Sequence, residues 1–218
     1  SMKKVIQLDP KLNKDEQILL SYCYKLMYSQ IYNAIMHITS TINEEIILGN
    51  KLHVEHLTQY KIKLMNEMEN FCNEIIGIID DQLLPSAIDD YCIFTYLHMK
   101  AKFYNYLCKN SQELRISDTA YKAKECYEKA INYINKVSTP DQPNYQGFYL
   151  NYTTFLYEIM GQKIEAIELS KKIYDKGVEA YDEIMEQNDC IYSECTFSLQ
   201  LLKLNADEWT KEMSLANE

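Results

Sequence analysis

Arginine is almost absent from this chain of 218 residues. Arg115 is the single arginine, and lysine supplies the rest of its 22 basic residues. Guanidinium groups are the side chains that clamp phosphate and carboxylate groups with two parallel hydrogen bonds. No site in the chain can therefore use two arginine forks. The net charge of −10 further argues against nucleic acid and anionic membranes as partners.

Glycine and proline are also scarce, with five and four residues respectively. Pro85, Pro140 and Pro143 fall where helical periodicity breaks, so they indicate the ends of helices. The sequence has no run of 18 apolar residues, so no transmembrane helix is predicted. With 47% hydrophobic residues the chain can bury a real core. The composition therefore predicts an all-α protein.

The cysteines follow no metal-binding or disulfide pattern. There are seven, an odd number, and no CxxC or Cys/His cluster has the spacing of metal ligands. We therefore expect reduced thiols in a cytoplasmic protein with no metal site and no cofactor. Glycine-rich phosphate loops and the GxSxG and HExxH motifs are missing, so we predict that the protein is not an enzyme. A nucleophilic Cys108 or Cys126 with a distant histidine is the remaining catalytic alternative.

Helical periodicity divides the chain into an N-terminal segment (1–12), a helical domain (13–211) and a short tail (212–218). Ser1-Met2 is typical of a cloning scar. About seven long antiparallel helices are predicted, at about 13–48, 52–83, 89–108, 118–137, 147–160, 163–186 and 189–211. Asn13 and Glu16 have the spacing of a capping box at the start of the first helix. The core stripe of that helix is predicted to pass through Leu19, Cys23, Leu26, Met27, Ala34 and Ile38.

The stretch 147–160 (GFYLNYTTFLYEIM) is apolar or aromatic on nearly every side of a helical wheel, which is typical of a buried helix. Asn151, Thr154 and Glu158 form one narrow polar strip along it. Such a strip needs hydrogen-bond partners, because an unpaired polar group in a core is costly. The strip is therefore either a satisfied buried network or the wall of a binding groove.

The predicted helix at 189–211 has two apolar arcs. One arc holds Cys195, Leu199, Leu202 and Ala206, and the other holds Phe197, Leu201 and Leu204, with Asn205 between them. One arc can pack on the preceding helix, while the other either meets a second neighbour or lines a groove. On the predicted helix at 89–108, the wheel places His98, Lys102, Asn105 and Tyr106 on neighbouring positions.

Six segments of the sequence, in order, resemble the 14-3-3 protein family. QILLSYCYKLM (17–27) and YSECTFSLQLLKLNADEWT (192–210) are similar to the two family signatures. The segments between them that match family helices are CNEIIGIIDDQLLPSA (72–87), YLHMKAKFYNYL (96–107), TPDQPNYQGFYLNYTTFLYEI (139–159) and KIEAIELSKKIYDKGVEAYDEI (163–184). The resemblance implies an antiparallel helical superhelix with a concave groove. It also implies an adaptor that holds phosphoserine or phosphothreonine peptides of client proteins in an extended conformation.

The resemblance also implies roles for single residues. Lys25 and Tyr106 match phosphate-binding positions, and Asn151 and Asn205 match the asparagines that hold the peptide backbone. The matching groove-lining positions are Leu150, Leu201 and Trp209, and Glu158 matches a groove acid.

Three positions depart from the family pattern. Tyr32 and Asn105 stand at the two arginines of the phosphate pocket, and His98 stands at a groove lysine, although Lys100 is kept. Each lost charge-assisted contact is worth roughly 1.5–3 kcal/mol. We therefore expect phosphate recognition to be weakened or altered.

The N-terminus departs from the family as well. Two further helices precede the first long helix in the family and supply much of its dimer interface. The resemblance therefore implies an N-terminally shortened member, with a non-standard interface in any homo- or heterodimer. The alternative function is a phosphate-independent scaffold or heterodimer subunit that acts through exposed helices at 13–83.

Overall fold

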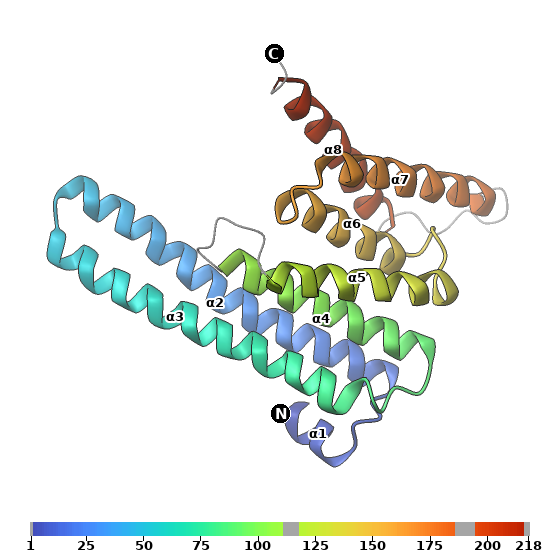
Figure 1. Ribbon diagram of the computed structural model, residues 1–218, viewed down its shortest axis with the longest axis horizontal. Helices are drawn as coiled ribbons and strands as arrows, with labels where there is room; N and C mark the ends of the chain where they lie inside the picture. Colours follow the sequence, from blue (N-terminus) through green and yellow to red (C-terminus); the bar gives the residue numbers. More distant parts are fainter. Residues whose placement is uncertain (1, 111–117, 186–194, 216–218) are drawn as a thin grey trace. The chain divides into compact units, whose positions relative to one another are not determined.

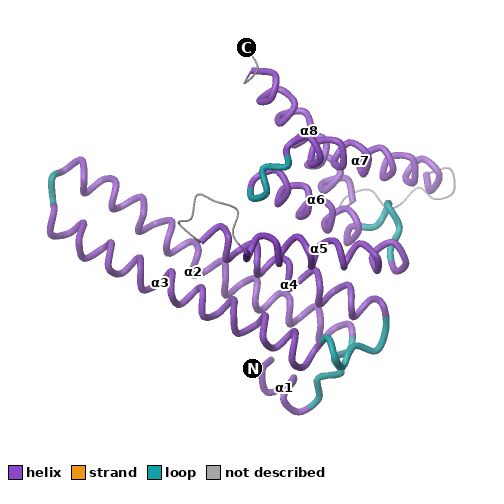
Figure 2. Tube along the Cα trace, in the orientation of Figure 1, coloured by secondary structure: helices purple, strands orange, loops and turns teal. Residues whose placement is uncertain are grey.

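The computed structural model describes residues 2–110, 118–185 and 195–215 (Figure 1). Every regular element in these ranges is helical, in agreement with the predicted all-α fold (Figure 2). The chain forms two compact units, Ser1–Gln112 and Glu113–Glu218. Arg115 and the predicted start of the last helix at 189–194 lie outside the described residues.

Helix α2 (Lys14–Leu48) has the ends that the sequence predicted. The Asn13 side-chain oxygen accepts a hydrogen bond from the Glu16 backbone N–H at 3.0 Å, and the Glu16 carboxylate accepts one from the Asn13 N–H at 2.9 Å. This reciprocal pair is the capping box. Gly49 ends the helix with a φ of 76°, in the left-handed region that glycine adopts readily. The chain then turns back into α3 (Lys51–Ile78).

The second predicted helix is not uniformly α-helical. After α3 the chain makes a π-helical turn, η1 (Ile79–Leu83), which the periodicity of the sequence did not indicate. Helix α4 (Asp90–Asn110) follows. Asp89 precedes α4, and its carboxylate accepts the backbone N–H of Cys92 at 2.7 Å. This contact lowers the pKa of Asp89 and satisfies an amide that the start of a helix leaves unpaired.

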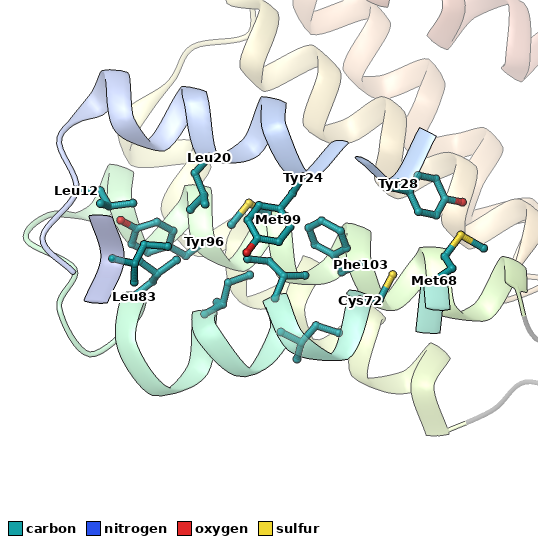
Figure 3. Close-up of a cluster of buried hydrophobic side chains, with 14 of the residues drawn as sticks. Leu12, Leu20, Tyr24, Tyr28, Met68, Cys72, Leu83, Tyr96, Met99 and Phe103 are labelled. Carbon is teal, nitrogen blue, oxygen red and sulfur yellow. The ribbon is translucent and has the colours of Figure 1, made fainter. Parts of the chain in front are cut away.

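Tyrosine and sulfur-containing side chains form much of the core of the first unit (Figure 3). Tyr24 of α2 stacks on Phe71 of α3, with ring centroids 5.2 Å apart, and meets Phe103 of α4 edge-on at 6.1 Å. The predicted core stripe of α2 was wrong at Leu19, Leu26 and Met27, which are 46–50% exposed, whereas its last members, Ala34 and Ile38, are partly buried against the core. The buried residues of α2 are Gln17, Leu20, Tyr24, Tyr28 and Ile35. Tyrosine rings thus face the core on the side of α2 where the prediction expected mainly aliphatic side chains.

A short helix, α1 (Met2–Leu8), precedes α2 and was not predicted. Ile6 and Leu12 are each only 2% exposed and belong to the same core as α2, α3 and α4. Lys3 also forms an ion pair with Glu74 of α3. Residues 2–12 therefore contribute to the folded unit.

The second unit consists of α5 (Asp118–Val137), α6 (Pro143–Glu158), α7 (Lys163–Met185) and α8 (Cys195–Leu215). Helix α6 is buried, as predicted, and its buried side chains include Phe148, Tyr152 and Phe155. All three rings lie against Tyr127 of α5, with centroid distances of 5.1–5.9 Å. Helix α6 begins four residues before the predicted start at 147, with Pro143 in its first turn, where a missing N–H costs nothing.

Helix α7 packs against both α6 and α8 (Figure 1). Gly177 of α7 lies so close to Leu199 of α8 that a methyl group at Gly177 would overlap the ends of the leucine side chain. Leu199 and Leu202 are 5% and 0% exposed. The close approach at Gly177 therefore seats one apolar arc of α8 against α7.

Candidate functional site

The residues predicted to contact a peptide divide between the two units. Helices α2 and α4 of the first unit carry Lys25, Tyr32, His98, Asn105 and Tyr106. Helices α6 and α8 of the second unit carry Leu150, Asn151, Glu158, Leu201, Asn205 and Trp209.

In the first unit, α2 and α4 lie side by side and run in the same direction. Near their starts, the Gln17 side-chain amide donates a hydrogen bond to the Cys92 sulfur at 3.1 Å. Farther along both helices, the rings of Tyr28 and Tyr106 stack at 3.7 Å with only 9° between their planes. Lys25 lies one turn before Tyr28. The two residues expected to bind phosphate, Lys25 and Tyr106, therefore lie on adjacent helices.

Tyr32, at the first altered arginine position, extends this aromatic contact. Its ring stacks on Tyr28 at 5.8 Å, so Tyr32, Tyr28 and Tyr106 form one stack. Burial raises the pKa of both Tyr28 and Tyr106, so both hydroxyl groups stay neutral near pH 7. The sequence pattern indicated no role for Tyr28, although Tyr28 lies three residues after Lys25 and four before Tyr32. An aromatic ring thus occupies the position that the resemblance matches to a family arginine.

His98 supplies no charge to compensate. Burial, together with the nearby ammonium group of Lys102, holds the pKa of His98 well below its usual range. The imidazole is therefore neutral near pH 7. Burial and the ammonium group of Lys25 in turn lower the pKa of Lys102. The helical wheel placed Lys102 beside His98, but gave it no role.

Lys100 of α4 is already in an ion pair, and Asn105, at the second altered position, is buried. Lys100 forms an ion pair with Asp80 of η1 at 2.6 Å. Asn105 is only 8% exposed. Among the described residues, no group donates a hydrogen bond to its side-chain oxygen. By contrast, no carboxylate of the described residues forms an ion pair with Lys25 or with Lys102.

In the second unit, the polar strip of α6 lies at the boundary between the core and the surface. The Asn151 side chain donates to the Gly147 carbonyl at 2.7 Å, and the Thr154 hydroxyl donates to the Leu150 carbonyl at 2.8 Å. Asn151 and Thr154 are half-buried, and Glu158 is exposed. Since an amide offers two donors and an acceptor, the bond to Gly147 leaves Asn151 with further capacity. This position favours the groove-wall alternative over a buried network.

The two predicted arcs of α8 have different surroundings. Leu202 and Ala206 of the first arc are buried, with 0% and 1% exposed. Phe197 and Leu204 of the second arc are 62% and 49% exposed. Asn205 is half-buried between the arcs. The second arc is therefore a surface of this unit that a partner chain can reach.

Trp209 contributes to the contact between α8 and α6. Its indole stacks on the Tyr157 ring at 4.2 Å and is 8% exposed. The Tyr157 hydroxyl donates to the Glu212 carboxylate at 2.6 Å. One face of Trp209 is thus already covered by α6, which the sequence did not indicate. Asn151 and Asn205 lie on these two packed helices.

The described part of the chain contains no group of three or more His, Cys, Asp or Glu residues placed to hold a metal ion. None of its helices is long and apolar enough to cross a membrane. Cys72 is free, and burial raises its pKa to about 12. A thiol that stays protonated is a poor nucleophile.

These observations define the class of protein: an all-helical protein with polar and aromatic side chains on accessible helix faces. A family model described as 14-3-3 protein matches residues 1–210. The chain is 30% identical to 14-3-3 protein 3 of Entamoeba histolytica, over 97% of this chain and 87% of that protein. It is 29% identical to the 14-3-3-like protein GF14 epsilon of Arabidopsis thaliana, over 98% and 83% respectively. It is 28% identical to 14-3-3 protein beta/alpha of Xenopus tropicalis, over 97% and 85%.

The chain belongs to the 14-3-3 protein family, as the resemblance of its six segments predicted. Members of this family are non-enzymatic adaptor proteins. Membership therefore supports an adaptor or regulatory role in which the protein binds client proteins and dimerises.

Proposed function

We propose that this protein is an adaptor that binds extended peptide segments of client proteins, with phosphoserine and phosphothreonine recognition weakened. Each unit contributes its own contacts. Lys25 and Tyr106 of the first unit contact the anionic group of the peptide. Asn151 and Asn205 of the second unit hold its backbone, beside Leu150, Leu201 and Trp209 and the acidic Glu158. The free thiols of Cys23, Cys72 and Cys92 support the further proposal of a cytoplasmic location.

The observation that carries this proposal is the pair of half-buried asparagines on α6 and α8. Both lie next to side chains that the core leaves accessible, and the Asn205 side chain forms no hydrogen bond with any described residue. Amide side chains suit the recognition of a peptide backbone because they donate and accept at once. The exposed arc of Phe197 and Leu204 adds apolar area for the side chains of the bound segment.

The weakened phosphate recognition follows from the two altered positions. Tyr32 is committed to a ring stack, and Asn105 is buried and uncharged. Neither offers the planar fork of donors that matches a phosphate. Two lost charge-assisted contacts, at roughly 1.5–3 kcal/mol each, would lower affinity for the phosphorylated segment by orders of magnitude.

Peptide libraries test both parts. One degenerate library carries a fixed central phosphoserine and the matched library carries serine, and binding of each is followed by fluorescence anisotropy. We expect Asn151→Ala and Asn205→Ala to weaken binding of both libraries. Asn135→Ala is the control, because Asn135 makes the same bond to the carbonyl four residues earlier, at an exposed position of α5.

Two results would contradict the proposal. If Asn151→Ala and Asn205→Ala bind like the unaltered protein, the backbone-holding role fails. If the phosphorylated library is preferred by more than about 100-fold, roughly 2.7 kcal/mol, phosphate recognition is not weakened.

Exposed apolar side chains favour a second candidate, a scaffold or heterodimer subunit that acts through α2 and α3. Leu19, Tyr22 and Leu26 of α2 are 46–61% exposed, and Leu52 and Tyr60 of α3 are 68% and 52% exposed. Such a surface supports a non-standard homo- or heterodimer interface. Light scattering of the purified chain tests self-assembly, because a stable monomer at all concentrations would leave only assembly with a different chain.

A further inference from the structure

Two lysines of the first unit lie close together without a counter-ion in the described residues. Lys25 on α2 and Lys102 on α4 each lie about one turn before the stacked rings of Tyr28 and Tyr106, on helices that run side by side in the same direction. The charge of Lys25 also acts on Lys102. The described residues include no carboxylate that forms an ion pair with either lysine, whereas Lys100, two positions earlier on α4, pairs with Asp80. The like charges of Lys25 and Lys102 are therefore left uncompensated.

This arrangement is costly unless an anion joins it. Two ammonium groups repel each other, and the repulsion grows as water is excluded from them. The result is visible at Lys102, where burial and Lys25 together lower the pKa. An anion bound by both would offset the repulsion and part of the cost of burying Lys102, while Lys25 is exposed. Lysine tolerates such a site because its ammonium group is a point charge on a flexible stem.

Asn105 gives a second and independent observation. It lies one turn after Lys102 on α4 and is 8% exposed, and its side-chain oxygen has no donor among the described residues. A buried acceptor without a partner costs free energy. A bound segment can supply the donor with its backbone N–H.

We propose that Lys102 and Lys25 together hold the anionic group of the bound segment. Lys102 then supplies the second cation at a site where Tyr32 and Asn105 occupy the two positions that the resemblance matches to arginines. The inference rests on the proposed peptide-binding function. The anionic group is a phosphoryl group, because its charge of about −1.5 to −2 near pH 7 matches two ammonium groups better than a carboxylate does. Two ammonium groups bind a phosphoryl group more weakly than two guanidinium groups do, but they still bind it.

The first test uses inorganic phosphate and the full chain. Lysine side chains labelled with carbon-13 are followed by NMR as phosphate is added. Phosphate should shift the signals of Lys102 and Lys25, and should leave those of Lys63, an exposed lysine of α3, unchanged. If Lys102 does not respond, the inference is overturned.

The second test uses the phosphoserine and serine libraries with Lys102→Met. This variant should lose roughly 10- to 150-fold in affinity for the phosphoserine library, which corresponds to one charge-assisted contact, and should bind the serine library almost unchanged. Lys63→Met makes the same change in net charge away from the pair and should behave like the unaltered protein. Circular dichroism checks that both variants are folded.

The outcomes separate this inference from the proposed function. Full phosphoserine affinity in Lys102→Met overturns the role of Lys102 while peptide binding stands. If phosphate shifts the Lys102 and Lys25 signals but neither library binds, the anion site stands and the peptide-binding function fails. A third library with a fixed glutamate tests whether a carboxylate is recognised instead. Equal binding of the glutamate and phosphoserine libraries would overturn the choice of a phosphoryl group.

Discussion

The Tyr157 ring lies almost parallel to the Trp209 indole, with centroids 4.2 Å apart and 8° between the planes. The Lys163 ammonium group lies 5.0 Å from the centroid of the Tyr157 ring. The Tyr157 hydroxyl donates to Glu212, and burial together with this carboxylate raises the pKa of Tyr157 to about 12. Residues of α6, α7 and α8 thus meet at one tyrosine ring, and two of these helices, α6 and α8, carry Asn151 and Asn205.

Replacing Trp209 should destabilise the second unit. Trp209→Ala removes a buried stacked ring and should cost about 3–5 kcal/mol in the free energy of unfolding, because the large cavity left behind cannot close fully. Urea unfolding followed by circular dichroism measures this loss. Tyr157→Phe keeps the stack and removes only the bond to Glu212, so it should cost about 1 kcal/mol. Equal losses in both variants would show that the stack itself contributes little.

Restoring a guanidinium group at position 32 should strengthen phosphate recognition. Tyr32 is 39% exposed and lies two helical turns after Lys25, so an arginine fits there without entering the core. Tyr32→Arg should raise the preference for the phosphoserine library over the serine library by roughly 10-fold or more, as expected for one charge-assisted contact. Tyr60→Arg, at an exposed position of α3, makes the same change in charge and should leave the preference unaltered. An equal gain in both variants would point to general electrostatic attraction.

The capping box at the start of α2 should contribute measurably to stability. Asn13→Ala leaves the Glu16 backbone N–H without its acceptor and should cost about 0.5–2 kcal/mol. Asn13→Asp keeps an acceptor at the same place and should be close to neutral. Thermal unfolding of both variants gives the comparison, and equal losses would show that the cap is not the cause.

Stability should fall as the pH drops below about 6.5, partly because of His98. Its pKa is lowered in the folded protein, so the unfolded chain takes up a proton that the folded chain does not. Above the unfolded pKa both states are neutral and the effect vanishes. One such proton gives a slope of at most about 1.4 kcal/mol per pH unit.

His98→Gln should flatten this slope between about pH 5 and pH 6.5, measured by urea unfolding at several pH values. His37→Gln is the control, because His37 is exposed on α2. If the slope is the same in His98→Gln and in the unaltered protein, other groups cause the pH dependence.

The helices were predictable because their ends carry local signals. Asn13 and Glu16 marked the start of α2, and Gly49 and Gly161, both with positive φ, stand where helices were predicted to end. The burial of α6 was also predictable, because apolar residues surround almost its whole circumference. These features depend on residues close together in the sequence.

Features that depend on contacts between helices were harder to predict. Tyrosine has an apolar ring and a polar tip, so it suits a core or a surface equally well. Periodicity alone therefore did not reveal that Tyr24 and Tyr28 form the core side of α2. The stack of Tyr28 on Tyr106 and the proximity of Lys102 to Lys25 join helices that are far apart in the sequence. The resemblance to the family indicated the candidate positions, but not these partners.

Helices α2 and α3 have fully buried side chains along only part of their length. Residues 36–63, all of them described, include no buried side chain, whereas Leu64, Met68 and Cys72 are buried beyond them. Opening the end of this hairpin near Gly49 therefore exposes little new apolar surface. Backbone amide hydrogens near that end should exchange with deuterium much sooner than those around Cys72, so exchange times should rise steadily along a single continuous helix.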